Sequence, residues 1–164
     1  MKQALSLGIL AAILFAIFVY FQELIGASAF YIAALSMAMF AVIGPFGDYL
    51  KTGIAMLIGV AVAMAGIVVL AGKFPLPPDN TAYIALVSGI AIFVLVLLSA
   101  IGLRIDAMFI GWAGYNAAVF PVYLTDASLL AEQALPAAVG VSVSLLVGLV
   151  LSLIVVRIAM AVNK

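Results

Sequence analysis

The sequence contains neither cysteine nor histidine, and only 7% of its 164 residues are charged. The absence of cysteine excludes disulfides and thiol nucleophiles, and the absence of both residues excludes thiolate and imidazole metal ligands. A soluble domain carries about a quarter of its residues as Asp, Glu, Lys and Arg. Because the formal net charge is zero, no excess of basic residues points to nucleic acid as a partner. The chain therefore lacks the polar surface of a water-soluble protein.

Long apolar runs occupy most of the chain instead. Hydrophobic residues make up 70% of the sequence, and its mean hydropathy is +1.48. A helix needs roughly 20 predominantly apolar residues to cross the hydrocarbon core of a bilayer. Residues 90–98 do not alternate between apolar and polar side chains, as the strands of a transmembrane β-barrel would. The sequence predicts an all-α membrane protein with six transmembrane helices, at 4–21, 30–43, 52–71, 82–101, 107–123 and 135–156.

The first run has a second interpretation. Lys2, the apolar run and the small residues Ala27-Ser28-Ala29 together resemble a secretory signal with its cleavage site. The run exceeds the roughly 7–15 residues of a signal core, and acidic and aromatic residues separate it from the small triplet. A retained transmembrane helix is therefore the favoured interpretation.

The basic residues predict the orientation of the chain. With six spans, one side of the membrane holds five of the six basic residues and the other holds only Lys73, together with four acidic residues. Basic residues in short loops mark the cytoplasmic side. The chain is therefore expected in the inner (cytoplasmic) membrane as a multi-pass protein with both termini cytoplasmic. The five cytoplasmic residues are Lys2, Lys51, Arg104, Arg157 and Lys164, and the acidic residues opposite them are Glu23, Asp79, Asp126 and Glu132.

The two halves of the chain resemble each other, which predicts an internal repeat. A single transmembrane domain, 1–164, would contain repeat 1 at 1–72, a proline-containing linker at 73–81 and repeat 2 at 82–164. Three spans per repeat is an odd number, so the halves would lie inverted, as in many transporters. Chance similarity between apolar helices is the alternative. The matching segments are Leu24-Ile25-Gly26 with Ala100-Ile101-Gly102, Phe30-Tyr31-Ile32 with Met108-Phe109-Ile110, and Gly59-Val60-Ala61-Val62 with Gly140-Val141-Ser142-Val143.

Small residues recur at four-residue steps in the third and sixth spans, and such residues let helix backbones approach closely in lipid. The sequence predicts tight helix packing there, with a homo-oligomer interface as one form of it and a pore lined by serine hydroxyls as the alternative. The packing residues are Gly59, Ala63, Gly140, Ser144, Gly148 and Ser152. Prolines predict helix breaks near the ends of the second and fifth spans, at Pro45 and Pro121.

The fifth span carries the most polar cluster inside any predicted span. Asn116 and Trp112 are four residues apart and share one helical face, whereas Tyr115 lies about 100° around the helix from Asn116. An unpaired amide is costly in hydrocarbon, so Asn116 must face protein or water. We predict that Asn116, Trp112 and Tyr115 bind substrate or line a pore, with Ser36 and Tyr31 of the second span facing the same axis. A purely structural hydrogen bond between helices is the alternative for Asn116.

The predicted spans contain no Asp, Glu, Lys or Arg. Proton relays and ion-coupled pumps place such residues within the bilayer, so the sequence favours a neutral or weakly acidic solute. Two charge pairs, Asp48 with Lys51 and Arg104 with Asp106, lie at the predicted membrane boundary, either as solvated pairs or as a gate at a pore mouth. No motif indicates catalysis, a cofactor or a metal, and we do not expect an enzyme.

Two families share features with these residues. The segment from Phe30-Tyr31-Ile32-Ala33-Ala34-Leu35 through Gly53 to Gly59 resembles the membrane domain of fusaric-acid-resistance-like aromatic acid exporters, which implies efflux of small organic acids. The run Phe109-Ile110-Gly111-Trp112-Ala113-Gly114-Tyr115 is similar to the Trp-containing fifth helix of a family of small uncharacterised bacterial inner-membrane proteins of about this length. That second resemblance would cover most of the chain and implies no activity.

These observations together predict an integral membrane channel or transporter for a small organic solute. The alternative is a non-transporting membrane subunit or scaffold of a larger complex, bound through the small-residue stripes. The expected partners are membrane lipid, the solute and further copies of the chain in a homo-oligomer, and no nucleic acid.

Overall fold

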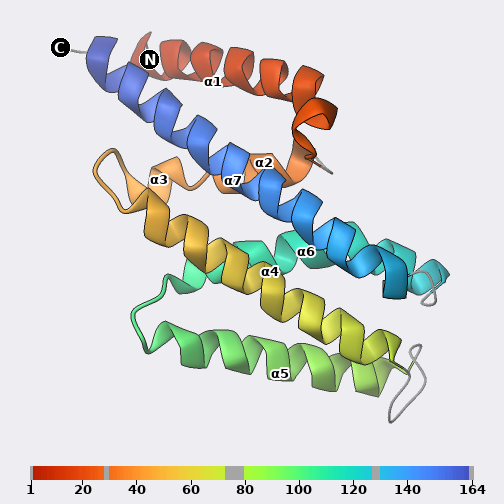
Figure 1. Cartoon of the computed structure of the whole chain (residues 1–164). Helices are drawn as coiled ribbons and strands as arrows, with labels where there is room; N and C mark the ends of the chain where they lie inside the picture. The colour runs from red at the N-terminus through yellow and green to blue at the C-terminus, as the bar shows by residue number, and fades with distance from the viewer. Residues whose placement is uncertain (1, 28–29, 73–79, 127–129, 163–164) are drawn as a thin grey trace.

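The computed structural model describes residues 2–27, 30–72, 80–126 and 130–162, and all regular secondary structure within those ranges is helical (Figure 1). A short 3₁₀ helix, η1, follows the first helix over Gln22–Ile25. The α-helices are α1 (Lys2–Phe21), α2 (Phe30–Met37), α3 (Phe40–Ile43), α4 (Tyr49–Ala71), α5 (Thr81–Ser99), α6 (Ile105–Thr125) and α7 (Leu130–Val162).

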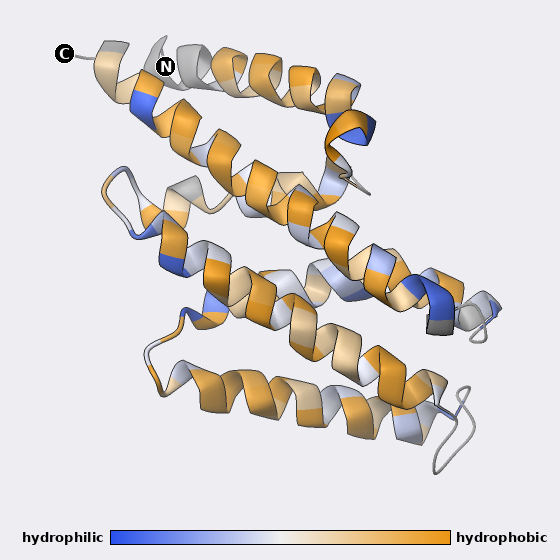
Figure 2. Ribbon diagram, in the orientation of Figure 1, coloured by the Kyte–Doolittle hydropathy of each residue, from blue (hydrophilic) through white to orange (hydrophobic). Residues whose placement is uncertain are grey.

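Four stretches among the described residues are long and apolar enough to cross a membrane: Gly8–Ile25, Tyr49–Ala71, Thr81–Ser99 and Glu132–Ala161. Apolar residues cover their outward faces as well as their packed faces (Figure 2). A helix that is apolar all round is buried in protein or lipid, and α1 and α5 have little protein around them. The chain is therefore an all-α membrane protein. The sequence predicts two further spans, one over α6 and one over α2 and α3.

The predicted second span differs from the structure, because residues 30–43 form two short helices instead of one. The backbone tightens between α2 and α3, where the N–H of Met39 donates to the carbonyl of Ser36 at 3.1 Å, a three-residue step. The N–H of Ile43 then donates to Met39 at 2.8 Å and starts a new turn. Gly44 follows with φ of 68°, and Pro45 lies in the loop before α4, so the chain leaves the helix where the proline predicts.

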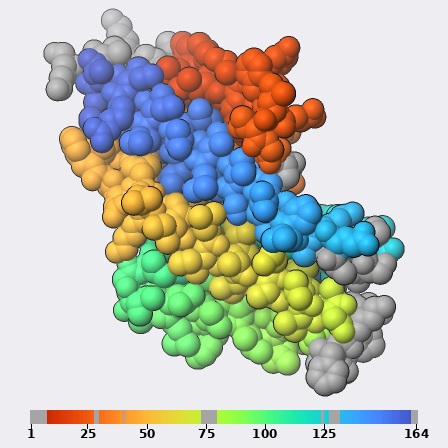
Figure 3. Space-filling model, viewed as in Figure 1, coloured from red at the N-terminus to blue at the C-terminus, as the bar shows by residue number. Residues whose placement is uncertain are grey.

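Helices α4 and α7 form the centre of the fold. Helix α4 packs against α6, α7 and α5, and α7 packs against α2, α4, α6 and α1. Figures 1 and 3 show α1 at one edge of the molecule and α5 at the opposite edge. The buried residues of α4 recur every three to four positions along the helix, as expected for one packed face; they are Thr52, Gly53, Ala55, Met56, Gly59, Val60, Ala63, Ile67 and Leu70.

Glycines set the closest approach between helices. A Cβ added to Gly59 would lie 2.0 Å from the carbonyl oxygen of Met108 on α6, and one added to Gly111 would lie 2.0 Å from that of Met56 on α4. Real Cβ atoms essentially never approach closer than 3.0 Å, so α4 and α6 cross with backbone against backbone. Gly148 of α7 makes the same kind of contact with α2, where an added Cβ would lie 2.1 Å from the carbonyl oxygen of Ala33.

Pro121 does not end its helix. The sequence predicts a break there, but α6 continues through Pro121 to Thr125. Proline removes one backbone N–H, and the helix tolerates the loss because the other bonds of the last turns are made. The hydroxyl of Thr125 donates to the carbonyl of Pro121 at 2.9 Å, and the N–H of Asp126 donates to the carbonyl of Val122 at 2.9 Å.

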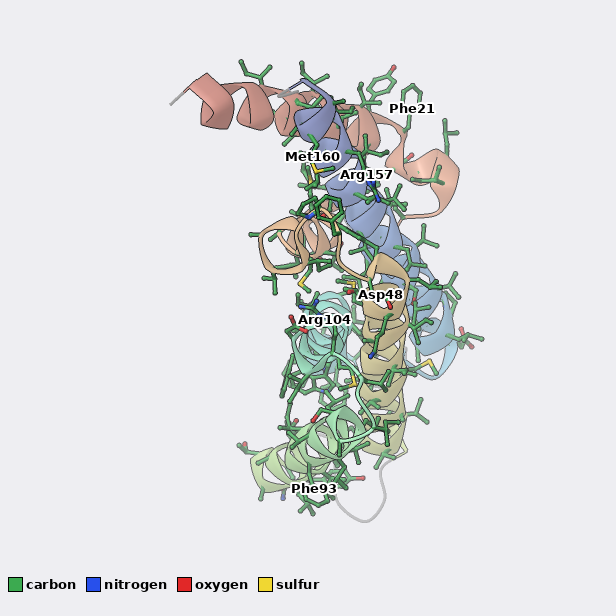
Figure 4. All side chains as sticks on the ribbon, turned by 90° about the vertical axis from the view of Figure 1, so that its left-hand side faces the viewer. Phe21, Asp48, Phe93, Arg104, Arg157 and Met160 are labelled. Atoms are coloured by element: carbon green, nitrogen blue, oxygen red, sulfur yellow. The ribbon has the colours of Figure 1, made fainter. Side chains whose placement is uncertain are left out.

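The start of α1, the end of α7 and the loops before α4 and α6 all lie at the left-hand side of Figure 1. Figure 4 views the molecule from that side, onto the ends of α4 and α6 that carry Asp48 and Arg104, with Arg157 near the end of α7. Asp48 caps α4, since its carboxylate accepts from the backbone N–H of Lys51 at 2.8 Å. The predicted linker lies mostly outside the described residues, and α5 begins at Thr81 with Asn80 as its cap.

Candidate functional site

An open groove of about 450 Å³ lies between α5 and α6. Two of its lining residues come from α5 and the others from the central and last turns of α6. Apolar side chains make up most of the lining, with hydrogen-bonding groups in the middle. The lining residues are Ile84, Ser88, Trp112, Asn116, Ala117, Phe120 and Pro121.

Asn116 provides the groove with unused hydrogen-bonding capacity. Its side-chain N–H₂ donates to the carbonyl of Trp112 on its own helix at 2.9 Å. A carboxamide has two N–H donors and an oxygen that accepts twice. The structure records no bond between another helix and this amide in the ranges it describes. The amide oxygen and the second N–H thus remain for a ligand or water, and the predicted interhelical hydrogen bond of Asn116 is not formed there.

Ser88 faces Asn116 from α5. Its side chain is half-buried, and no hydrogen bond is recorded for its hydroxyl within the described ranges. Pro121 has no N–H to donate to the carbonyl of Ala117, four residues earlier, and both residues also line the groove. The hydroxyl of Ser88 on α5 and the carboxamide of Asn116 on α6 therefore lie on opposite walls of an otherwise apolar groove.

The two polar side chains of the groove lie inside their helices, although the groove itself extends to the first turn of α5 at Ile84 and the last turns of α6 at Pro121. Ser88 is seven residues from the start of α5, which corresponds to about 10 Å along the axis, and Asn116 is nine residues from the end of α6, or about 14 Å. No Asp, Glu, Lys or Arg is among the residues that line it. Its lining is therefore uncharged.

The other predicted site residues lie elsewhere. Tyr115 is fully buried and donates its hydroxyl to the carbonyl of Ala134 at 3.0 Å, so it joins α6 to α7. Ser36 is also fully buried, donates to the carbonyl of Ala33 at 3.0 Å, and lies at the crossing of α2 with α7. Tyr31 is half exposed on the outer face of α2, where its ring packs edge-on against Phe30. Of the five residues, only Trp112 and Asn116 come together.

The sequence prediction missed the α5 side of the groove. Ser88 was a recognisable signal, since it is the only hydroxyl or amide side chain between Tyr83 and Ser99 in an otherwise apolar helix. Ile84 and Phe120 gave no such signal, because apolar side chains fill every position around them. Which apolar residues border a groove depends on helix crossing and register, and these follow from packing in three dimensions.

The serines of α7 do not face an open pore. Ser144 is fully buried and donates to the carbonyl of Gly140, four residues earlier, at 2.8 Å. Ser152 is fully buried as well, and its hydroxyl has no partner among the described residues. Gly140, Ala63 and Gly148 lie on buried faces beside them or across from them. The predicted small-residue stripes thus lie at helix contacts.

An ion pair stands where α6 begins. The guanidinium of Arg104 binds both carboxylate oxygens of Asp106, with Nε at 3.1 Å from one oxygen. The hydrogen bond from Arg104 lowers the pKa of Asp106, and the backbone N–H of Ala107, which donates to the same carboxylate at 2.9 Å, adds to this effect. The carboxylate at the first turn also complements the positive end of the helix dipole. Both charges remain partly exposed.

No family model, curated protein or solved structure matches this chain. Within the described ranges, no cluster of three or more Asp and Glu side chains is placed to hold a metal ion.

Proposed function

We propose that this protein is a membrane transporter or channel for a small, uncharged or weakly acidic organic solute, which binds in the groove between α5 and α6. The observation that carries the proposal is the pair of side chains Ser88 and Asn116, which line the groove away from the helix ends and have hydrogen-bonding capacity to spare. Such groups are costly in hydrocarbon without partners. A polar solute or water entering the groove supplies the partners.

The proposal takes α6 and the pair α2 and α3 as the fifth and sixth membrane crossings. Helix α6 has 21 residues and a length of about 31 Å, enough for the hydrocarbon core of about 30 Å. Tyr115 of α6 is fully buried and directs its hydroxyl into the protein, toward α7. Residues 30–43 are short for a span, and local thinning of the bilayer accommodates short spans at modest cost. An even number of crossings agrees with the five-to-one division of basic residues.

The packing of the helices supports an inverted repeat. The repeat relates α4 to α7 and α6 to α2. Helix α4 of the first half packs against α6 of the second, and α7 of the second half packs against α2 of the first. Helix α5 lies against α4 as α1 lies against α7. In Figure 1, α1 and α5 run in opposite directions at opposite edges, and so do α4 and α7 at the centre. A two-fold axis in the membrane plane, between α4 and α7, would relate the halves, as in many transporters.

The chemistry of the groove defines the solute class. Asn116 offers a donor and an acceptor, Ser88 a hydroxyl, and Trp112 an aromatic ring with one N–H donor. A hydroxyl, amide or protonated carboxyl group of the solute would exchange its hydrogen bonds to water for these. A fixed charge would lose its hydration without an opposite charge in return. The groove therefore favours neutral molecules and the protonated form of weak acids.

The test uses purified protein in liposomes and compares Asn116→Leu with Tyr115→Phe. Asn116 bonds only its own helix, so its replacement should leave the protein folded and abolish the protein-dependent flux of small neutral solutes such as glycerol. Tyr115→Phe removes a bond between α6 and α7 and should leave flux intact. Equal flux in wild type and Asn116→Leu would reject the site. Absence of flux in every variant, with a stoichiometric partner retained on purification, would instead support a scaffold subunit.

A further inference from the structure

A second cavity, of about 380 Å³, lies on the other side of α5, between α5 and α4. Its walls consist only of valine, isoleucine, alanine and glycine side chains. It therefore has the character of hydrocarbon and offers no partner for a polar group. The lining residues are Val62, Ala65, Gly66, Val69, Val87, Ile90, Ala91 and Val94.

A narrow crevice of about 20 Å³, with room for about one water molecule, lies beneath α5 between this cavity and the groove. The crevice shares Gly66, Val87 and Ala91 with the apolar cavity. It shares another four residues with the groove, namely Ser88, Trp112, Asn116 and Phe120. The three spaces thus adjoin one another beneath α5, with polar groups at one end and only apolar groups at the other; together they are called the passage below.

Small residues form the narrow part of the passage. Gly66 faces Val87 across it, and a Cβ on Gly66 would lie 3.6 Å from the Val87 side chain, an ordinary contact. Any larger side chain at Gly66 would therefore extend into the crevice. Ala91 borders the same crevice from α5.

Helix α5 is held by fewer packed residues than α4 and α7. Only 17% of the α5 span is buried, against 39% for α4 and 44% for α7. Phe93 points away from the bundle at its outer edge (Figure 4). The hydroxyl of Tyr83 ties the start of α5 to the carbonyl of Val69 at 3.0 Å. A small outward shift of the rest of α5 would widen the crevice at the cost of few packed side chains.

We infer that the passage binds a single-chain amphiphile with an uncharged hydrogen-bonding headgroup. This inference rests on the proposed function and names the substrate class of the same site. The headgroup occupies the groove at Ser88, Trp112 and Asn116, and the alkyl chain passes under α5 into the apolar cavity. The headgroup is uncharged because no Asp, Glu, Lys or Arg lines any of the three spaces. The ligand has one chain because the crevice is narrow.

The test measures binding to the full chain in nanodiscs through the fluorescence of Trp112, the only tryptophan in the protein. The probes are 1-decanoylglycerol, glycerol as the headgroup alone, decanoate as a charged analogue and 1,2-didecanoylglycerol as a double-chain lipid. Gly66→Leu blocks the crevice. Gly89→Leu is the matched control, because Gly89 lies on α5 with open space around it. Ala91→Leu blocks the crevice from the opposite wall, so the test does not depend on one variant folding.

We expect 1-decanoylglycerol to bind wild type and Gly89→Leu equally, and Gly66→Leu and Ala91→Leu at least tenfold more weakly. Glycerol should bind all four proteins with the same low affinity. In wild type, decanoate and the double-chain lipid should each bind at least tenfold more weakly than 1-decanoylglycerol. If glycerol flux in the liposome test depends on Asn116 but the blocking variants bind 1-decanoylglycerol as wild type does, the amphiphile inference is wrong and the proposed function stands. If no probe changes Trp112 emission, both are wrong. Equal binding of the double-chain lipid would show a general lipid site and overturn the inference.

Discussion

Replacing Gly59 by alanine should force α4 and α6 apart. The new Cβ would lie 2.0 Å from the carbonyl oxygen of Met108, and even a separation of 3.0 Å would need about 1 Å of movement. The obstructing atom is a backbone carbonyl oxygen of the packed helix α6, so no side-chain rotation relieves the clash. Gly111→Ala creates the reciprocal clash with the carbonyl of Met56.

The expected size of the effect follows from two opposing terms. Overpacking costs about 1–3 kcal/mol, and a backbone obstacle belongs at the upper end of that range. Alanine gains about 1 kcal/mol over glycine in helix propensity. Each variant should therefore lose about 2 kcal/mol of stability, a factor of about 30 in the ratio of folded to unfolded protein. The double variant should lose less than the sum, since a single separation of α4 and α6 relieves both clashes.

The assay is unfolding in detergent micelles by added sodium dodecyl sulfate, followed by far-ultraviolet circular dichroism. Gly66→Ala and Gly89→Ala are the controls, because a Cβ at Gly66 makes an ordinary contact and one at Gly89 meets nothing. Both controls should unfold at the same or a higher detergent concentration than wild type. If Gly59→Ala were as stable as Gly89→Ala, the backbone contact between α4 and α6 would not exist as described.

Three more variants test other contacts in the same assay. Gly148→Ala should destabilise the protein by a similar amount to Gly59→Ala, because its Cβ would lie 2.1 Å from the carbonyl oxygen of Ala33; unchanged stability would contradict the contact of α7 with α2. Tyr115→Phe should lose about 1 kcal/mol, since a buried hydroxyl bond to α7 is removed, and a loss of solute binding instead would place Tyr115 in the site. Asp106→Asn removes a carboxylate whose pKa is lowered by Arg104. The stability advantage of wild type over this variant should be complete above the ordinary aspartate pKa of about 4 and should disappear as pH falls through the lowered pKa; an advantage that persists in acid would refute the role of the ion pair.

Hydropathy and short-range spacing were enough to predict the helical class and much of the candidate site. Apolar length placed α1, α4, α5 and α6 within three residues of their observed bounds, whereas α7 begins five residues earlier and ends six residues later than predicted. A four-residue spacing placed Trp112 and Asn116 on one helical face, and both line the same groove. These properties are local to one helix, so the sequence carries them directly.

Properties that depend on contacts between helices could not be predicted in the same way. The internal repeat matches Gly59 of α4 with Gly140 of α7. Gly59 touches the backbone of α6, but the α7 glycine that touches the backbone of α2 is Gly148, about two turns further along. We expected Ser36 to face the same axis as Asn116, which requires the two repeats to match residue by residue. Ser36 lies instead where α2 crosses α7. The turn between α2 and α3 likewise has no proline or glycine to announce it.

Cysteine labelling tests the six-crossing arrangement most directly, because the natural chain has no cysteine and gives no background. Four exposed positions serve as single-cysteine variants: Glu23, Phe46, Ile101 and Glu132. In intact cells, a membrane-impermeant maleimide should label Glu23→Cys and Glu132→Cys and should reach Phe46→Cys and Ile101→Cys only after the membrane is permeabilised. Labelling of Phe46→Cys and Ile101→Cys from opposite sides, or of Glu23→Cys and Glu132→Cys from opposite sides, would contradict two inverted three-helix halves.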